Sequence, residues 1–185
     1  MSIIEQAINF AAAAHDGQTR KATNIPYITH PFAVGMLLQK EQCTDEVIAA
    51  GILHDTIEDT SATYEDLENQ FGKQIARLVL AASERDKSLP WEQRKQHTID
   101  ALKHAGLDEI KIITADKLHN LRSIHADLII QGEKIWERFN RGKRDQQWYY
   151  TGIIKALSPR RNEFALIGEL EKEVESVFGS HFHHE

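Results

Sequence analysis

Residues 52–60 read Ile-Leu-His-Asp-Thr-Ile-Glu-Asp-Thr and place a His-Asp doublet four positions before a Glu-Asp doublet. Side chains four positions apart lie on one face of a helix, so His54 is expected beside Glu58 and Asp55 beside Asp59. One helix face then carries an imidazole and three carboxylates. That grouping is suited to binding a divalent metal ion and directing a water molecule next to it.

The residues around these doublets are those of a buried helix, because Val47–Leu53 and Ile57 are apolar apart from Gly51. An unpaired charge is costly in such a setting, so buried charges are usually paired or bound to a metal. An exposed acidic face on a surface helix is the alternative interpretation. The apolar surroundings favour the metal site.

Two further residues complete a donor set of two imidazoles and two carboxylates. His30 lies at the expected start of a helix and Asp116 lies in a long apolar helix, and they join His54 and Asp55. A mixed nitrogen and oxygen set suits Mn²⁺, Fe²⁺ or Zn²⁺ and leaves coordination positions for water and substrate. Such a site predicts hydrolysis of a phosphate ester.

The second doublet provides candidates for activating the water. Glu58 and Asp59 are expected to orient it or to take its proton, and the spacing does not distinguish which of them acts as the base.

Composition restricts the classes of protein to consider. The chain has 185 residues, 41% of them hydrophobic and 27% charged, which fits one globular domain spanning 1–185. Its net charge of −6 argues against binding nucleic acid. Neither a membrane-spanning segment nor a signal peptide is evident, and a single cysteine, Cys43, excludes internal disulfides. We therefore expect a cytoplasmic protein whose metal ligands are histidine and carboxylate.

Apolar residues recur every three or four positions almost throughout, which predicts an all-α fold without strands. A polar loop with a proline is expected at 18–29, and a helix should begin at Pro31. The next helix should begin at Thr44 or Asp45 and carry both doublets. The expected helices are about 3–15, 31–40, 45–60, 63–72, 72–82, 90–104 and 108–131, with two or three more over 136–178 interrupted near Gly142 and Pro159.

Four ordered motifs resemble those of HD-domain hydrolases of the RelA/SpoT type, and in particular a stand-alone small alarmone hydrolase. They are Ala-Ala-His-Asp-Gly-Gln-Thr-Arg-Lys at 13–21, Pro-Tyr-Ile-Thr-His-Pro at 26–31, His-Asp-Thr-Ile-Glu-Asp-Thr at 54–60 and Asp-Lys-Leu-His-Asn-Leu-Arg at 116–122. Residues 86–95 also match that group. The resemblance extends to about residue 125, and the helices expected at 133–178 carry no motif that we can assign.

The resemblance implies an all-helical HD phosphohydrolase domain that removes the 3′-pyrophosphate of guanosine tetra- or pentaphosphate with Mn²⁺ or another divalent metal. Carried over by position, the metal ligands are His30, His54, Asp55 and Asp116. The water-activating pair is then Glu58 and Asp59. The chain is too short for the synthetase and regulatory domains of the long members, which predicts hydrolase activity alone.

The resemblance also implies a set of substrate contacts. The planar guanidinium of Arg20 is expected to stack on the purine. The residues expected to line the nucleotide pocket are Lys21, Asn120, Arg122 and Ser123, with Lys87 and Arg94 facing phosphate charge. The family segment Lys-Leu-Ala-Asp reads Ile-Thr-Ala-Asp at 113–116, so one basic group that the family usually carries near the site is missing, and the motif leaves the choice of substrate open.

Two other functions remain open. An HD phosphohydrolase acting on another nucleotide, such as an adenosine analogue of the alarmone or a nucleoside monophosphate, would keep the metal site. A catalytically silent nucleotide sensor would not need the Glu58 and Asp59 pair. The oligomeric state has no signal in the sequence.

Overall fold

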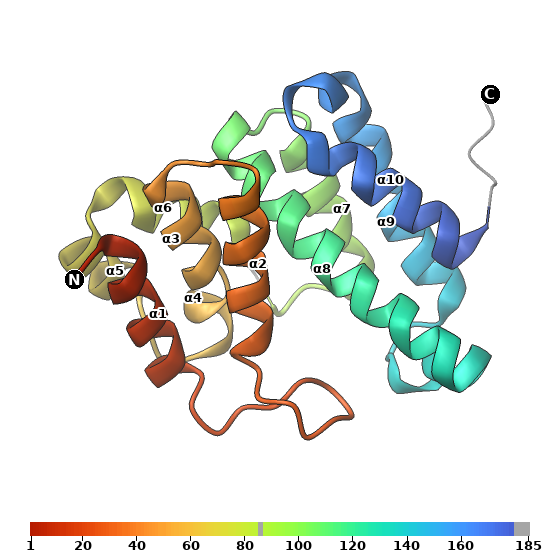
Figure 1. Cartoon of the computed structure of the whole chain (residues 1–185). Coiled ribbons are helices and arrows are strands. Elements are labelled where there is room, and N and C mark those ends of the chain that lie inside the picture. Colours follow the sequence, from red (N-terminus) through yellow and green to blue (C-terminus); the bar gives the residue numbers. More distant parts are fainter. Residues whose placement is uncertain (85–86, 180–185) are drawn as a thin grey trace. The chain divides into compact units, whose positions relative to one another are not determined.

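The computed structural model describes residues 1–84 and 87–179, and every regular element in those two ranges is a helix (Figure 1). One isolated antiparallel bridge joins Thr19 to Pro26 in the loop before the second helix. The prediction of an all-α fold is therefore confirmed. No helix in the described part of the chain combines the length and the apolar character needed to cross a bilayer.

The described residues form two compact units. The first comprises residues 1–84 and 106–116, and the second comprises residues 87–105 and 117–179. The expectation of a single domain over 1–185 stays a prediction. The first unit contains α1 (Ile3–Ala14), α2 (Thr29–Lys40), α3 (Asp45–Leu53), α4 (Thr56–Asp59), α5 (Tyr64–Phe71), α6 (Lys73–Ala82) and the beginning of α8 (Leu107–Gln131).

Several helix boundaries fall where the sequence places them. Thr63 accepts a hydrogen bond from the backbone N–H of Asp66, whose carboxylate accepts one from the backbone N–H of Thr63, so a capping box begins α5. Gly72 ends that helix with a φ of 83°, a backbone conformation that favours glycine. Sequence signals of this kind act locally and are read without knowing the tertiary fold.

The helix expected to carry both doublets is interrupted between them, which corrects the prediction of one continuous helix. α3 ends at Leu53 and the short α4 begins at Thr56. Two buried side chains donate hydrogen bonds to backbone carbonyl oxygens near the end of α3. Thr56 Oγ1 donates to Leu53 O at 2.7 Å, and His54 Nδ1 donates to Gly51 O at 2.7 Å. These bonds offer the backbone carbonyls a partner other than the next helical turn.

The start of the preceding helix, α2, also differs slightly from the expectation. α2 begins at Thr29 rather than at Pro31, so His30 lies within its first turn. Pro31 is tolerated there because the first N–H groups of a helix have no intrahelical acceptor.

Two glycines let α2 and α3 approach closely, and this fixes the spacing between the helix that contains His30 and the helix that ends just before His54. A Cβ at Gly35 would overlap the side chain of Ile52, and one at Gly51 would overlap that of Leu38. Figure 1 shows α1, α2 and α3 lying together in this unit.

Replacing Gly51 with alanine should lower the free energy of unfolding, because inserting atoms into a packed interior usually costs about 1–3 kcal/mol, more than the gain of up to about 1 kcal/mol from replacing a glycine inside a helix. Leu38 would have to move to make room for the new methyl group. Chemical denaturation of the two proteins measures the change. Gly106→Ala is the control, because a Cβ there meets no atom within 4 Å. Equal stability of Gly51→Ala and the wild type would contradict this packing.

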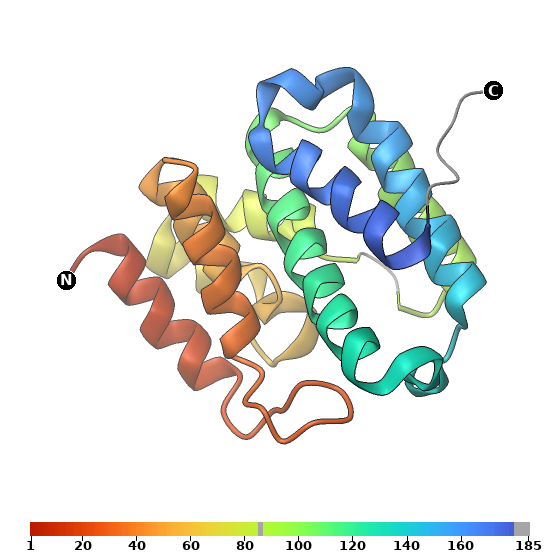
Figure 2. The ribbon, with the colours of Figure 1, turned by 45° about the vertical axis from the view of Figure 1, so that its right-hand side comes forward.

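The second unit contains α7 (Trp91–Leu102), the rest of α8, η1 (Gly132–Arg138), α9 (Lys143–Leu157), η2 (Ser158–Glu163) and α10 (Ala165–Phe178). Within it α9 packs against α7 and α10, as Figure 2 shows. Tyr149 of α9 is buried and its ring lies 6.1 Å from that of Trp91. The interruptions expected near Gly142 and Pro159 are confirmed.

Candidate metal centre

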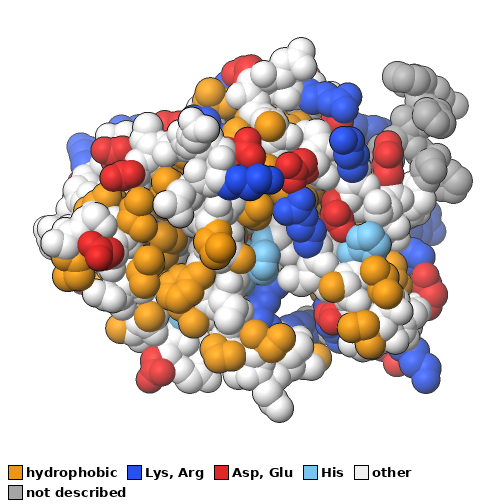
Figure 3. Space-filling model, in the orientation of Figure 1, with side chains coloured by type: hydrophobic (Ala, Val, Ile, Leu, Met, Phe, Trp, Pro, Cys, Tyr) orange, Lys and Arg blue, Asp and Glu red, His pale blue; other side chains and the backbone are white. Residues whose placement is uncertain are grey.

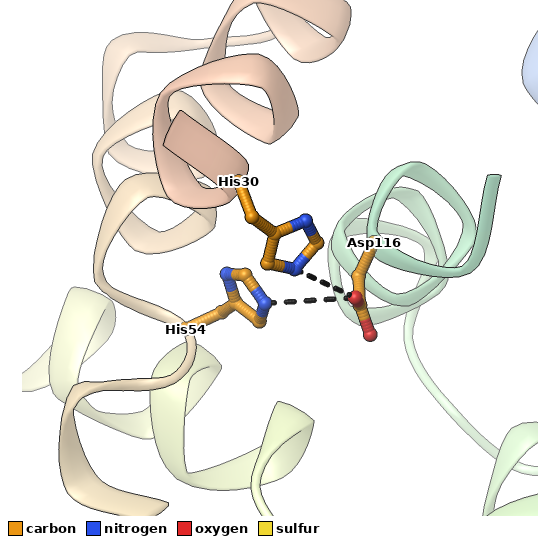
Figure 4. A group of neighbouring side chains, drawn as sticks. All are labelled: His30, His54 and Asp116. Atoms are coloured by element: carbon orange, nitrogen blue, oxygen red, sulfur yellow. Dashed lines mark ion pairs between the residues drawn. The ribbon is translucent and has the colours of Figure 1, made fainter. Parts of the chain in front are cut away.

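Two helices and one turn each bring one side chain to a common point in the first unit. His30 comes from α2, His54 from the turn after α3, and Asp116 from α8. Asp116 Oδ1 lies 3.1 Å from His30 Nε2 and 3.7 Å from His54 Nε2 (Figure 4). One ligand atom from each residue lies within 4.8 Å of the others. All three side chains are buried, so this group is able to hold a metal ion.

Asp55, the fourth residue expected in the set, also reaches this point. Its Oδ2 lies 3.0 Å from His54 Nε2 and 3.6 Å from His30 Nε2. The structure therefore brings together all four residues that the sequence selected as ligands. Two imidazole nitrogens and two carboxylates are a donor set that fits a divalent metal.

A backbone hydrogen bond on the side of the ring away from the carboxylates fixes the orientation of His54. Its Nδ1 donates to the carbonyl oxygen of Gly51 at 2.7 Å, which requires the proton to be on that nitrogen. In the neutral ring, Nε2 then presents its lone pair toward the carboxylates. A backbone carbonyl that fixes the tautomer in this way is a usual outer partner of histidine metal ligands.

The charges of the site depend strongly on one another. Burial lowers the pKa of His30. Burial also opposes the charged form of His54, but Asp55 and Asp116 outweigh it and raise the pKa of His54. Burial acts to raise the pKa of Asp55, and the neighbouring His54 reverses this and lowers it. The side chains of Asp55 and Asp116 are only 15% and 12% exposed, so they need positive charge beside them, which a divalent cation would supply.

Glu58 and Asp59 lie on α4, directly after Asp55 along the chain. Glu58 is half-buried and its pKa is raised, chiefly by burial, although its carboxylate accepts a hydrogen bond from the backbone N–H of Glu84 at 3.0 Å. Asp59 has an exposed side chain. A carboxyl group with a raised pKa next to a possible metal site is suited to proton transfer near neutral pH. Their assignment as the water-activating pair stays a prediction.

The expected substrate contacts are divided between the two units. Arg20 belongs to the first, and its guanidinium carbon lies 5.6 Å from the centre of the Tyr27 ring. Lys21 is exposed in the same loop. The others belong to the second unit, where the side chain of Lys87 is exposed and those of Asn120 and Arg94 are half-buried. Two of them have partners within that unit: Ser123 Oγ donates to His119 O, and Arg122 forms an ion pair with Glu169 at 2.6 Å. Their role in binding a nucleotide stays a prediction.

Sequence reasoning assigned no role to Tyr27, Gln18 or His15, which lie close around the candidate site. Tyr27 Oη donates to Asp55 Oδ2 at 2.6 Å, and Gln18 Nε2 donates to the carbonyl oxygen of Asp59 at 2.8 Å. His15 Nδ1 donates to Gln18 Oε1 at 2.8 Å. The available signal was their place in the quoted segments 13–21 and 26–31.

The chain matches a known protein family over most of its length. The family model described as HD domain matches residues 7–145, most of the chain. The chain belongs to the HD domain family. This HD domain protein is 40% identical over 127 residues to guanosine-3′,5′-bis(diphosphate) 3′-pyrophosphohydrolase MESH1 of Danio rerio, covering 67% of this chain and 70% of that protein. It is also 40% identical over 127 residues to bifunctional (p)ppGpp synthase/hydrolase SpoT of Escherichia coli K12, but the match covers only 18% of SpoT.

Solved structures have the same fold. A crystal structure of a protein from Listeria monocytogenes EGD-e has 37% sequence identity and a TM-score of 0.76, covering 80% of this chain and 98% of that one. A metazoan orthologue of SpoT, reported to hydrolyse ppGpp and to act in starvation responses, has 30% identity and a TM-score of 0.77, covering 95% and 94%. The second match extends the similarity well beyond the part that carries the motifs.

Proposed function

We propose that this HD domain protein is a metal-dependent hydrolase that removes the 3′-pyrophosphate of guanosine tetra- and pentaphosphate, giving GDP or GTP and pyrophosphate. The convergence of two imidazoles and two carboxylates in the first unit is the observation that carries the proposal. The names of relatives at 40% identity supply the reaction.

His30, His54, Asp55 and Asp116 would hold the cation, for which we propose Mn²⁺. A bound divalent cation polarises a phosphoryl oxygen and lowers the pKa of water beside it. The carbonyl oxygen of Gly51 keeps the His54 ring in position. His30 lies beside Asp116 and His54 beside Asp55, and these carboxylates would balance the positive charge of the cation. The residues thus form an anionic group of fixed orientation, in which a bound cation would offset the repulsion between the carboxylates of Asp55 and Asp116.

Glu58 and Asp59 would hold the attacking water and accept its proton. The water oxygen adds to the phosphorus attached to the ribose 3′ oxygen, the bond from that phosphorus to the 3′ oxygen breaks, and the 3′ oxygen takes up a proton. Burial supports Glu58 as the base, because a raised pKa brings its carboxylate closer to the range in which it both accepts and releases a proton.

We also propose, from the family resemblance, that Arg20 stacks on the purine and that the remaining cationic and polar residues contact sugar and phosphates. Those residues are Lys21, Asn120, Arg122, Ser123, Lys87 and Arg94. Planar guanidinium groups suit stacking, and charged or amide groups suit phosphate oxygens.

Replacing Arg20 with alanine should weaken binding of the nucleotide roughly 5- to 150-fold, since stacking of a base contributes about 1–3 kcal/mol. Mn²⁺ affinity should stay unchanged, because Arg20 is not among the proposed ligands. Steady-state KM and calorimetry with Mn²⁺ alone measure the two effects. Arg77→Ala on the exposed side of α6 is the matched control. Wild-type nucleotide affinity in Arg20→Ala would remove Arg20 from the proposed pocket.

The choice between guanosine and adenosine substrates calls for a direct comparison. Purified protein with Mn²⁺ is incubated with guanosine tetraphosphate, with the adenosine analogue, and with nucleoside monophosphates, and products are separated by chromatography. Preferential cleavage of the guanosine compound supports the proposal. Preferential cleavage of an adenosine compound or a monophosphate would keep the metal chemistry and replace the substrate, as the missing basic group at 113–116 leaves open.

We further propose that the chain works as one domain, acts in the cytoplasm and does not bind nucleic acid. Its net charge of −6 supports the last point. On the face drawn in Figure 3, Lys and Arg side chains lie among Asp and Glu side chains rather than in one basic surface. A single cysteine fits a reducing compartment.

A further inference from the structure

A tyrosine outside the proposed ligand set is bonded to one of its carboxylates. Tyr27 Oη donates to Asp55 Oδ2 at 2.6 Å, a length typical of a hydroxyl bonded to a charged carboxylate. The same oxygen lies 3.0 Å from His54 Nε2 and 3.6 Å from His30 Nε2. Tyr27 therefore contacts the atom of Asp55 that faces the two histidines.

We propose that Tyr27 is a positioning residue that holds the Asp55 carboxylate in the orientation needed to bind the metal. A carboxylate on a short side chain has two rotatable bonds, and a hydrogen bond to one oxygen fixes both rotations. Asp55 lies in the turn between α3 and α4, outside both helices, so its backbone is less constrained than that of a residue within a helix. An outer hydrogen bond has most influence on such a ligand.

The ring of Tyr27 is itself held firmly by the loop in which it lies. Its backbone N–H donates to Gln18 O at 2.8 Å, and its ring centre lies 4.9 Å from that of His15. Gln18 bonds to His15 and to the carbonyl oxygen of Asp59, which ties the loop to α4. Removing the hydroxyl alone should therefore leave the ring and loop in place.

This loop also connects the proposed metal ligand to the proposed purine contact. The guanidinium of Arg20 lies over the Tyr27 ring, whose hydroxyl bonds to Asp55. The isolated bridge between Thr19 and Pro26 closes the loop between these residues. The inference deepens the proposed function and rests on it for the kinetic part of the test only.

The test is the Tyr27→Phe variant, which keeps the ring and removes the hydrogen bond. Titration calorimetry of the nucleotide-free protein with Mn²⁺ should show affinity weakened about 10- to 100-fold, the usual effect of losing an outer partner of a metal ligand. Tyr64→Phe is the matched control, because Tyr64 Oη makes only a 3.4 Å contact with Glu68 on α5. Its Mn²⁺ affinity should equal that of the wild type.

Kinetics distinguish positioning from general support of the fold. At a Mn²⁺ concentration near the dissociation constant of the wild type, Tyr27→Phe should lose turnover. Its KM for guanosine tetraphosphate should change little, because the ring beside Arg20 remains. A lower melting temperature combined with wild-type Mn²⁺ affinity would overturn the proposal. So would an unchanged affinity with no loss of stability. If the wild type bound Mn²⁺ but cleaved no guanosine tetraphosphate, the proposed function would fail while the calorimetric comparison still decided the role of Tyr27.

Discussion

The Asp116→Asn variant is expected to bind Mn²⁺ at least about 100-fold more weakly than the wild type. Losing a charged ligand should cost more than losing a residue that only hydrogen-bonds to a ligand, which usually weakens metal binding about 10- to 100-fold. Asp116 Oδ1 lies 3.1 Å from His30 Nε2, and the substitution removes the charge of this side chain while keeping its shape. Metal catalysis of this kind contributes several kcal/mol to the transition state. We therefore expect turnover to fall on the order of 10³-fold.

Calorimetry with Mn²⁺ and initial rates at fixed metal concentration measure these two losses. Asp108→Asn is the matched control, because Asp108 lies on the same helix and pairs with Lys111 at the surface. That variant should retain wild-type affinity and rate. A fully active Asp116→Asn variant with unchanged Mn²⁺ affinity would show that Asp116 is not a ligand.

The second large effect is expected from Glu58→Gln combined with Asp59→Asn. Turnover should fall about 10²- to 10⁴-fold, the usual contribution of general acid–base catalysis, because neither amide accepts a proton from water. Mn²⁺ affinity should stay within a few-fold of wild type, since both residues lie outside the proposed ligand set. Single-turnover rates and calorimetry on the same preparation separate the chemical step from metal binding.

The pH dependence of each single variant identifies the base. Burial raises the pKa of Glu58 above its ordinary value of 4.5, and a base must be ionised, so kcat/KM should decrease as pH falls through that raised pKa. Glu58→Gln should lose this acid limb, whereas Asp59→Asn should keep it. The reverse pattern would assign the base to Asp59. Unimpaired turnover in the double variant would reject both residues, and unchanged biological activity without turnover would favour a nucleotide sensor.

The sequence predicted the helical fold from strong local patterns, and it predicted the four candidate ligands from the His-Asp doublet together with the family resemblance. Apolar periodicity determines a helix wherever it is sustained, and the capping box at Thr63 and the glycine at Gly72 mark boundaries through backbone chemistry alone. His30 and Asp116 are far apart in sequence, and family resemblance supported their place beside His54. In the first unit Asp116 Oδ1 lies 3.1 Å from His30 Nε2 and 3.7 Å from His54 Nε2, and the role of these residues as ligands stays a prediction.

Other features depend on tertiary contacts that a one-dimensional pattern does not contain. Spacing alone favoured a continuous helix through both doublets, but the side chains of His54 and Thr56 bond to backbone carbonyls and interrupt it. The sequence pattern indicated no role for Tyr27, whose hydroxyl donates to Asp55, 28 positions further along the chain. The Arg122 guanidinium reaches Glu169, 47 positions further along, a partner that no local motif indicates.

The position of bond cleavage tests the central claim most directly. Phosphorus-31 NMR, recorded after the reaction is stopped with EDTA because paramagnetic Mn²⁺ broadens phosphate resonances, should show intact pyrophosphate and GDP. These products should form with Mn²⁺ and be suppressed when EDTA is present from the start. Release of orthophosphate, loss of the 5′-diphosphate, or hydrolysis that continues at the same rate in EDTA would contradict a metal-dependent 3′-pyrophosphohydrolase.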